Sequence, residues 1–115
     1  MAITAVFPAG VVSVTLKPSY QWDRGQTLEI HVSKLTPRVE VHYSYPGLDE
    51  AIACTCTVSE GVAIAPIPDA CFEQPHPITA WVYVMSPAQG KTIKKITIPI
   101  IERTMPPRKA LEVSV

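Results

Sequence analysis

Three cysteines and a histidine are the residues of this 115-residue chain whose types best suit a metal site. Cys54 and Cys56 alternate in an extended segment, so a strand would place both on one face, about 7 Å apart. Cys71 and His76 would have to complete the set, and these spacings match no familiar zinc pattern. An odd number of cysteines also cannot pair fully within one chain, which fits a reducing compartment. We therefore expect free thiols that act as small apolar side chains, and no metal or other cofactor.

Residues that could catalyse a reaction are not arranged for it. No serine or cysteine stands in a G-x-S-x-G elbow, and the base nearest to Cys71 in sequence is His76, which lies between two prolines. Asp49 and Glu50 follow a Pro-Gly turn, and Asp69 in Pro-Ile-Pro-Asp is expected to form an Asx turn rather than half of a carboxylate pair. The five glycines are isolated, so no phosphate-binding loop is predicted. The sequence therefore predicts that the protein is not an enzyme.

Aromatic rings are the remaining side chains that could bind a ligand. Tyr20 and Trp22 stand two positions apart in Tyr-Gln-Trp-Asp-Arg-Gly-Gln, residues 20–26, so an extended backbone would place both rings on one face. Flat rings of this kind can stack on a sugar, and they can equally cover the open end of a β-sandwich. Trp81 stands in the most apolar segment and is expected in the core. We interpret residues 20–26 first as structure, with Trp22 more than half buried.

The second half of this stretch has the composition of a chain reversal. Asp23 can bond to nearby backbone and Gly25 can adopt a positive φ, so Asp23, Arg24 and Gly25 are expected to form the turn. If the stretch binds anything, its two rings and its guanidinium are the groups available. Tyr20, Trp22 and Arg24 are therefore the candidate contacts with a partner or a glycan.

Turn-forming residues divide the chain into short extended segments. The sequence holds 12 prolines and 5 glycines. They recur about every ten residues, and the segments between them alternate polar and apolar residues or are β-branched. This pattern is typical of a β-sandwich or barrel, and leaves little room for helices. Strands are expected at residues 3–7, 11–16, 27–32, 39–45, 51–58, 62–67, 78–85 and 91–102.

Alternation within these segments predicts which side chains face the core. The segment 78–85 is apolar at successive positions and is expected to be a central strand that is covered on both faces. The side chains expected to point inward are Leu28, Ile30, Val32, Val39, Val41, Tyr43 and Tyr45, and those expected to point outward are Glu29, His31, Glu40, His42 and Ser44.

Two hairpins are predicted from the turn chemistry. Ser59, Glu60 and Gly61 should join the strands 51–58 and 62–67. The strands 78–85 and 91–102 should form the second hairpin, with Pro99 restricting the end of the last strand to an edge or a bulge.

Charge and hydropathy indicate neither a nucleic-acid nor a membrane partner. Ten acids balance ten bases, and charged residues make up only 17% of the chain. The last quarter is basic, but a solvated hairpin face explains it, because no aromatic residues lie between the bases to provide stacking surfaces. No secretory signal pattern begins the chain, and no apolar run approaches the roughly 18 residues that span a bilayer. Synthesis in a cytoplasm is therefore expected.

An ordered series of short motifs carries a resemblance to a known family. The motifs are Tyr-Gln-Trp-Asp-Arg-Gly-Gln at 20–26, Val-Glu-Val-His at 39–42, Pro-Ile-Pro-Asp at 66–69, Ala-Trp-Val-Tyr-Val at 80–84 and Ile-Glu-Arg-Thr-Met-Pro at 101–106. In this order the chain resembles a family of small phage and prophage proteins of Firmicutes over nearly residues 3–107. The ordered series is more specific than any single motif.

This resemblance implies a fold and a function. Residues 1–107 would form one immunoglobulin-like antiparallel β-sandwich, a non-enzymatic structural protein of the virion. It would dock on the capsid, as a decoration protein or head-fibre anchor, or on the tail baseplate, with other virion proteins and further copies of itself as partners. Residues 108–115 would form a tail that could add as a strand to its own sheet or a neighbour's through Leu111, Val113 and Val115. A carbohydrate-binding module for adsorption to the bacterial surface is the alternative.

Overall fold

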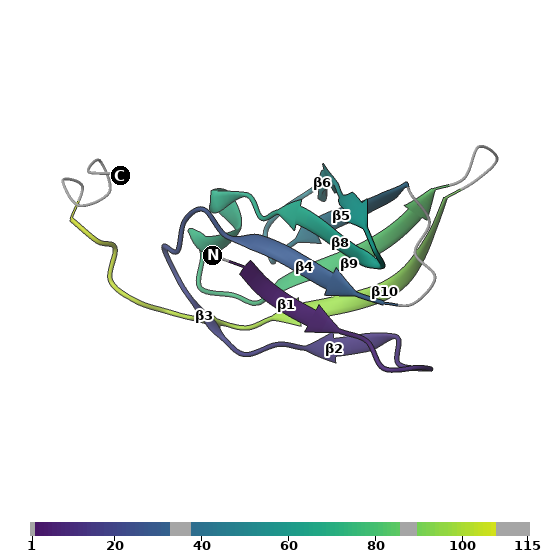
Figure 1. Ribbon diagram of the computed structural model, residues 1–115. Coiled ribbons are helices and arrows are strands. Elements are labelled where there is room, and N and C mark those ends of the chain that lie inside the picture. The colour runs from purple at the N-terminus through teal and green to yellow at the C-terminus, as the bar shows by residue number, and fades with distance from the viewer. Residues whose placement is uncertain (1, 33–37, 86–89, 108–115) are drawn as a thin grey trace.

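The computed structural model consists of short strands joined by turns and loops (Figure 1). It describes residues 2–32, 38–85 and 90–107, and the predicted tail at 108–115 lies outside these residues. Within them, the one helix is a single 3-10 turn, η1 (Asp69–Phe72), and no helix is long and apolar enough to cross a membrane. The strands are β1 (Ala2–Val6), β2 (Ser13–Thr15), β3 (Ser19–Tyr20), β4 (Thr27–His31), β5 (Val39–Ser44), β6 (Ile52–Thr55), β7 (Thr57–Ser59), β8 (Val62–Pro66), β9 (Ile78–Met85), β10 (Gly90–Ile98) and β11 (Ile100–Ile101).

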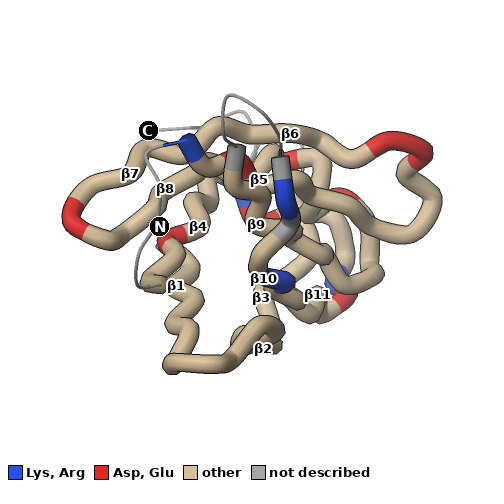
Figure 2. The backbone as a smooth tube through the Cα atoms, turned by 90° about the vertical axis from the view of Figure 1, so that its right-hand side faces the viewer, with Lys and Arg blue, Asp and Glu red and all other residues tan. Residues whose placement is uncertain are grey.

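Two main sheets pack against each other as a sandwich, which confirms the predicted all-β class. One sheet has the strand order β1-β4-β8-β7, and the other has the order β2-β10-β9-β5-β6. The short strands β3 and β11 form a third, two-stranded sheet. The charged residues of the described chain are spread around the molecule rather than gathered on one side (Figure 2).

Most neighbouring strands are antiparallel, but the first three strands pair in parallel. β1 lies parallel to β4, β2 to β10 and β3 to β11. A parallel pair needs a long connection, and the excursion of the chain through β2 and β3 provides one between β1 and β4. The antiparallel sandwich that the motif resemblance implies is therefore correct for the body of both sheets and wrong for these three pairs.

The core lies between the two main sheets and is built by alternating side chains. In β4 Leu28 and Ile30 are buried, and in β5 Val39, Val41 and Tyr43 are buried. Their neighbours Glu29, His31, Glu40, His42 and Ser44 are more exposed. The predicted faces of both strands are therefore confirmed. The largest fully buried side chains elsewhere in the described chain include Phe72, Ile78, Ile96, Ile98 and Val82.

The segment 51–58, predicted as one strand, is two strands in different sheets. β6 pairs with β5, whereas β7 pairs with β8. The change occurs at Cys56, whose side chain is buried and whose amide donates to the carbonyl of Val39 at 2.9 Å. Such a bend lets one continuous segment pass from one packed sheet to the other. The predicted turn is confirmed, because Glu60 and Gly61 both have positive φ, which suits a two-residue hairpin loop.

The strand β9 is central, as predicted, but only one of its faces is covered. It lies between β10 and β5, and Ile78, Ala80 and Val82 are fully buried. Trp81 is 36% exposed and points away from the core, so the expectation of a core tryptophan is wrong. Its apolar composition misled because the outward positions of this strand hold large rings instead of polar groups.

The second predicted hairpin is also present, and Pro99 ends it. β10 pairs with β9 through a register irregularity between Thr92 and Lys94. β10 then stops at Ile98, and after Pro99 the chain leaves the five-stranded sheet to pair with β3 as β11. A proline cannot donate to the ladder, which accounts for the break. The short partner β3 was not predicted.

Candidate functional site

Three segments that are far apart in sequence meet at one end of the sandwich, at the left of Figure 1. They are residues 20–26, 67–73 and 101–105, and we call them together the motif end. The amide of Gln21 donates to the carbonyl of Ile101, and the amide of Ile67 donates to the carbonyl of Gln26, both at 2.9 Å. Parts of the first, third and last motifs of the series thus form one structural unit.

Gln21 joins all three segments of the motif end. Its side chain is almost fully buried, at 7% exposure. Its Nε2 donates to the carbonyl of Glu73 at 3.4 Å, and its Oε1 accepts from the amide of Arg103 at 3.2 Å. Buried polar groups are costly unless they are paired, so this glutamine is a structural link. The sequence gives no local signal for this link, because both bonding partners of the side chain are distant in sequence.

Trp22 occupies a position in a turn that normally requires glycine. The turn runs from Tyr20 to Asp23 and is closed by a hydrogen bond from the Asp23 amide to the Tyr20 carbonyl at 3.2 Å. Trp22 has a φ of 75°, which costs a residue with a Cβ on the order of 1–3 kcal/mol unless its surroundings hold it. They do so here: its amide donates to the Phe72 carbonyl at 2.7 Å, and its Nε1 donates to the Arg103 carbonyl at 3.2 Å.

The predicted features of residues 20–26 are therefore partly correct. Trp22 is mostly buried, as expected. Asp23 does bond to the backbone, because its Oδ2 accepts from the Tyr20 amide at 3.2 Å, and Gly25 does have a positive φ. The reversal itself begins earlier than predicted, at Tyr20. As a result Tyr20, which is 53% exposed, and Trp22 do not share one face of an extended segment. The alternative of a two-ring sugar platform required both rings on one face of an extended segment, which this turn does not provide.

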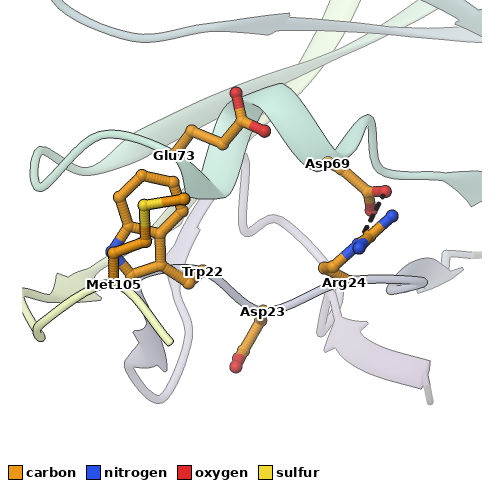
Figure 3. A pocket seen from close by; sticks show the side chains of 6 residues that line it. All are labelled: Trp22, Asp23, Arg24, Asp69, Glu73 and Met105. Carbon is orange, nitrogen blue, oxygen red and sulfur yellow. Dashed lines mark ion pairs between the residues drawn. The ribbon is translucent and has the colours of Figure 1, made fainter. Parts of the chain in front are cut away.

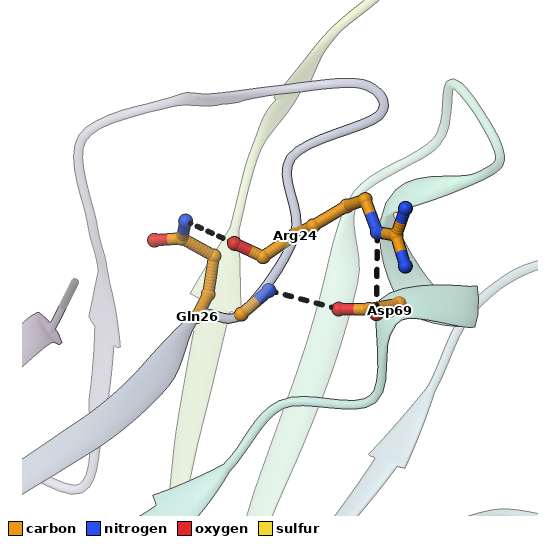
Figure 4. Close-up of polar contacts among 4 residues, drawn as sticks. Arg24, Gln26 and Asp69 are labelled. Carbon is orange, nitrogen blue, oxygen red and sulfur yellow. Dashed lines mark hydrogen bonds and ion pairs between the residues drawn. The ribbon is translucent and has the colours of Figure 1, made fainter. Parts of the chain in front are cut away.

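Arg24 and Asp69 connect the first two segments across the surface. The Arg24 Nε lies 3.6 Å from an Asp69 carboxylate oxygen, and the other oxygen accepts from the Gly25 amide at 2.9 Å (Figure 4). The Gln26 side chain donates to the Arg24 carbonyl at 3.0 Å. Asp69, expected to make a local Asx turn, thus bonds across to another segment. Because both charged side chains are about half exposed, the ion pair itself contributes little stability.

A small hollow of about 190 Å³ opens at the motif end. Its lining includes Trp22, Asp69 and Met105, with Met105 beside the indole (Figure 3). Clefts that bind small molecules usually measure about 300–1,000 Å³, so this one is too small to enclose an ordinary substrate. Met105 and Glu73, which also lines it, were not singled out from the sequence.

Two of the three cysteines, Cys56 and Cys71, are buried, and Cys54 is half-buried. Burial raises the pKa of Cys56 and of Cys71 to about 11, and it also raises the pKa of Cys54. A nucleophilic or metal-binding cysteine needs its pKa lowered, so these thiols stay protonated at neutral pH. All three are free. Within residues 2–32, 38–85 and 90–107, no group of three His, Cys, Asp or Glu side chains is placed to hold a metal ion.

The chain matches no model of a known protein family, and it has no significant match among curated proteins.

Proposed function

We propose that the chain is a non-enzymatic structural protein of a bacteriophage particle. It docks on the capsid, as a decoration protein or head-fibre anchor, or on the tail baseplate, after synthesis in the host cytoplasm. The support begins with the ordered motif series. Three of its five motifs contribute to one hydrogen-bonded unit at the motif end, where Gln21 and Asp69 bond to backbone groups of other segments.

The observation that carries the proposal is the apolar surface at this end. Tyr20 is 53% exposed, Ile101 42% and Met105 52%, and they are three of the seven large hydrophobic side chains that are exposed in the described chain. Ile101 is the register partner of Tyr20, and Met105 lies beside Trp22 (Figure 3). Exposed apolar side chains at one end of a molecule are typical of a protein contact.

The charge distribution supports contact through shape and apolar area rather than through long-range attraction. The chain has ten acids and ten bases, and neither kind is gathered on one side of the described molecule (Figure 2). Binding that buries apolar area responds weakly to salt, unlike binding that depends on opposite charges. We propose other virion proteins as the partners and further copies of the chain as neighbours in the particle.

The test is to purify phage particles by density gradient and measure the chain by quantitative mass spectrometry. The proposal expects it in the particle at a fixed copy number: hundreds of copies indicate the capsid, and a few dozen indicate the baseplate. Particles that contain none of it would refute the virion role.

A paired substitution tests the docking surface. The double substitution Tyr20→Ser with Met105→Ser removes apolar area from the motif end. The control Ile64→Ser removes a similarly exposed side chain, at 44%, from the outer face of the four-stranded sheet. The double variant is expected to be lost from particles assembled in its presence, while Ile64→Ser is retained. Equal incorporation of both variants would show that docking uses another surface.

A further inference from the structure

The outer face of the five-stranded sheet carries a second group of side chains with binding chemistry. Register partners in neighbouring strands point to the same side of a sheet, so they form rows across it. One row crosses all five strands of this sheet, from Ser13 through Lys95, Trp81 and His42 to Ala53. Trp81, one of the two tryptophans of the chain, stands at its centre.

Three rings lie together on this face. Trp81 is 36% exposed, and the cross-strand partner of Trp81 on β5 is His42. The ring of His42 stacks on the ring of Tyr83, with centroids 4.8 Å apart and planes 21° from parallel. The Lys95 ammonium lies 5.4 Å from the centre of a Trp81 ring, a weak contact at an exposed site that a ligand can displace.

Hydrogen-bonding groups surround these rings. The Glu40 carboxylate lies 2.9 Å from Nε2 of His42, and Glu40 is the register partner of Tyr83. Beside the central row runs a row of hydroxyl groups. Its members are Thr15, Thr97, Thr79 and Ser44, one from each of four adjacent strands.

We propose that this face binds an uncharged polysaccharide, with Trp81 as the ring on which a sugar stacks. A pyranose has an apolar C–H face and a rim of hydroxyls, and the sheet offers both partners: rings for the face, and hydroxyls, Glu40 and Lys95 for the rim. The side chains named on this face include one acid, Glu40, and one base, Lys95, and each already contacts a neighbour on the sheet. A face with this balance favours a neutral ligand over a charged one.

A protein partner fits this face less well. The cores of protein interfaces are largely apolar, but Trp81 here has Thr79 and Lys95 as neighbours rather than aliphatic side chains. At the motif end, by contrast, the aliphatic Ile101 and the sulfur-containing Met105 are exposed. Sugar binding would therefore use a surface separate from the proposed docking surface, and either proposal can fail without the other.

Tryptophan fluorescence of the full chain tests the proposal directly. In a Trp22→Phe background Trp81 is the only tryptophan left to report. The probes are cellohexaose, maltohexaose and N-acetylchitohexaose, with polygalacturonate as the charged comparison. At least one neutral oligosaccharide is expected to change the Trp81 emission with saturation at millimolar concentration or below, while polygalacturonate does not.

Isothermal titration with the responding sugar then tests the residues. Trp81→Ala is expected to weaken binding about tenfold or more, and Glu40→Gln to weaken it several-fold. Tyr20→Ser is the control that should bind as the parent does. Melting curves confirm that each variant folds, and if Trp81→Ala does not, the comparison uses Trp81→Leu and Glu40→Gln.

Three results would overturn the proposal. The first is the absence of a response to all three neutral oligosaccharides. The second is a folded substitution of Trp81 that binds as tightly as the parent. The third is a parent chain that sediments as a dimer and becomes monomeric when Trp81 is replaced, because the face would then be a protein interface.

Discussion

The two tryptophans of this chain stand in regions that use similar side chains for opposite purposes. At the motif end the polar groups bond to backbone: Trp22 donates to the Arg103 carbonyl, and Gln21 contacts two other segments. On the outer face of the five-stranded sheet the polar groups contact other side chains, as in Glu40 with His42. A group that bonds to backbone is part of the fold, whereas side chains in contact only with each other can exchange those contacts for a ligand.

A second pair of similar sequences shows how much the surroundings matter. A glutamate lies beside a histidine both in Leu-Glu-Ile-His of β4 and in Val-Glu-Val-His of β5. The distance from the glutamate Oε1 to the histidine Nε2 is 3.0 Å in β4 and 2.9 Å in β5. His31 lies between Val6 and Val62 in its sheet, whereas His42 lies between Trp81 and Ala53 and stacks on Tyr83. The local motif is the same, and the register of the neighbouring strands makes one of the two part of an aromatic group.

The largest effect of a single substitution is expected from Gln21→Ala at the motif end. The substitution removes two side-chain hydrogen bonds and leaves the Arg103 amide and the Glu73 carbonyl without this partner. We expect the free energy of unfolding to fall by about 2–3 kcal/mol in urea titrations. Gln26→Ala is the matched control, because its bond to the Arg24 carbonyl is local, and it should cost less than about 1 kcal/mol. Equal losses would mean that Gln21 does not link the segments.

Alkaline pH should destabilise the fold through its buried thiols, one of which, Cys71, lies in η1 at the motif end. Burial raises the pKa of Cys56 and Cys71 to about 11, whereas an unfolded thiol titrates near 8.5. The contribution of these thiols to the free energy of unfolding is therefore fully present below about pH 8.5. It falls as the pH rises towards 11, because the unfolded chain loses these protons first. By pH 11 the loss is on the order of 3 kcal/mol for each thiol.

Urea titrations from pH 8 to pH 11 check this prediction. The double variant Cys56→Ala with Cys71→Ala should lose much of the alkaline slope, although its stability at pH 8 will be lower because small cavities remain. A variant with the same slope as the parent would assign the alkaline effect to other groups.

The fold was largely predictable because the alternation of polar and apolar residues shows which face of a strand is buried. This held for β4 and β5, where polar and apolar residues alternate. It failed for β9, where Trp81 and Tyr83 made the outer face as apolar as the inner one. It failed also at Cys56, because a strand that changes sheets keeps its composition and changes only its partners.

Of the motif end, only the presence of a turn within residues 20–26 was predictable from the sequence. Asp23 and Gly25 have intrinsic turn preferences, and these indicate a reversal. The positive φ of Trp22 contradicts such preferences, and contacts with Phe72 and Arg103, distant in sequence, hold it there. The aromatic group on the outer face depends on the pairing of β5, β9 and β10, which no local pattern specifies.

Replacing each tryptophan by phenylalanine compares the two regions directly. Trp22→Phe removes the Nε1 donor to Arg103 and should lower the free energy of unfolding by about 1 kcal/mol. Trp81→Phe keeps a ring on an exposed face and should change it by less than about 0.5 kcal/mol. Thermal melts of the two variants measure the difference. A larger loss from Trp81→Phe would mean that the outer face stabilises the fold more than the motif end does.

A small effect of the opposite sign is expected from Tyr43→Phe, beneath the outer face. The Tyr43 side chain is fully buried, and its hydroxyl has no hydrogen-bond partner within the described part of the chain. Burial also raises the pKa of this hydroxyl. Removing an unpaired buried hydroxyl should stabilise the fold by about 0.5 kcal/mol, because the folded state no longer has to desolvate it. His42→Phe, on the opposite face of the same strand, should instead disturb the aromatic group. If Tyr43→Phe destabilises the protein, the hydroxyl has a partner in solution, and β5 is then held by a polar contact on its inner face as well as on its outer one.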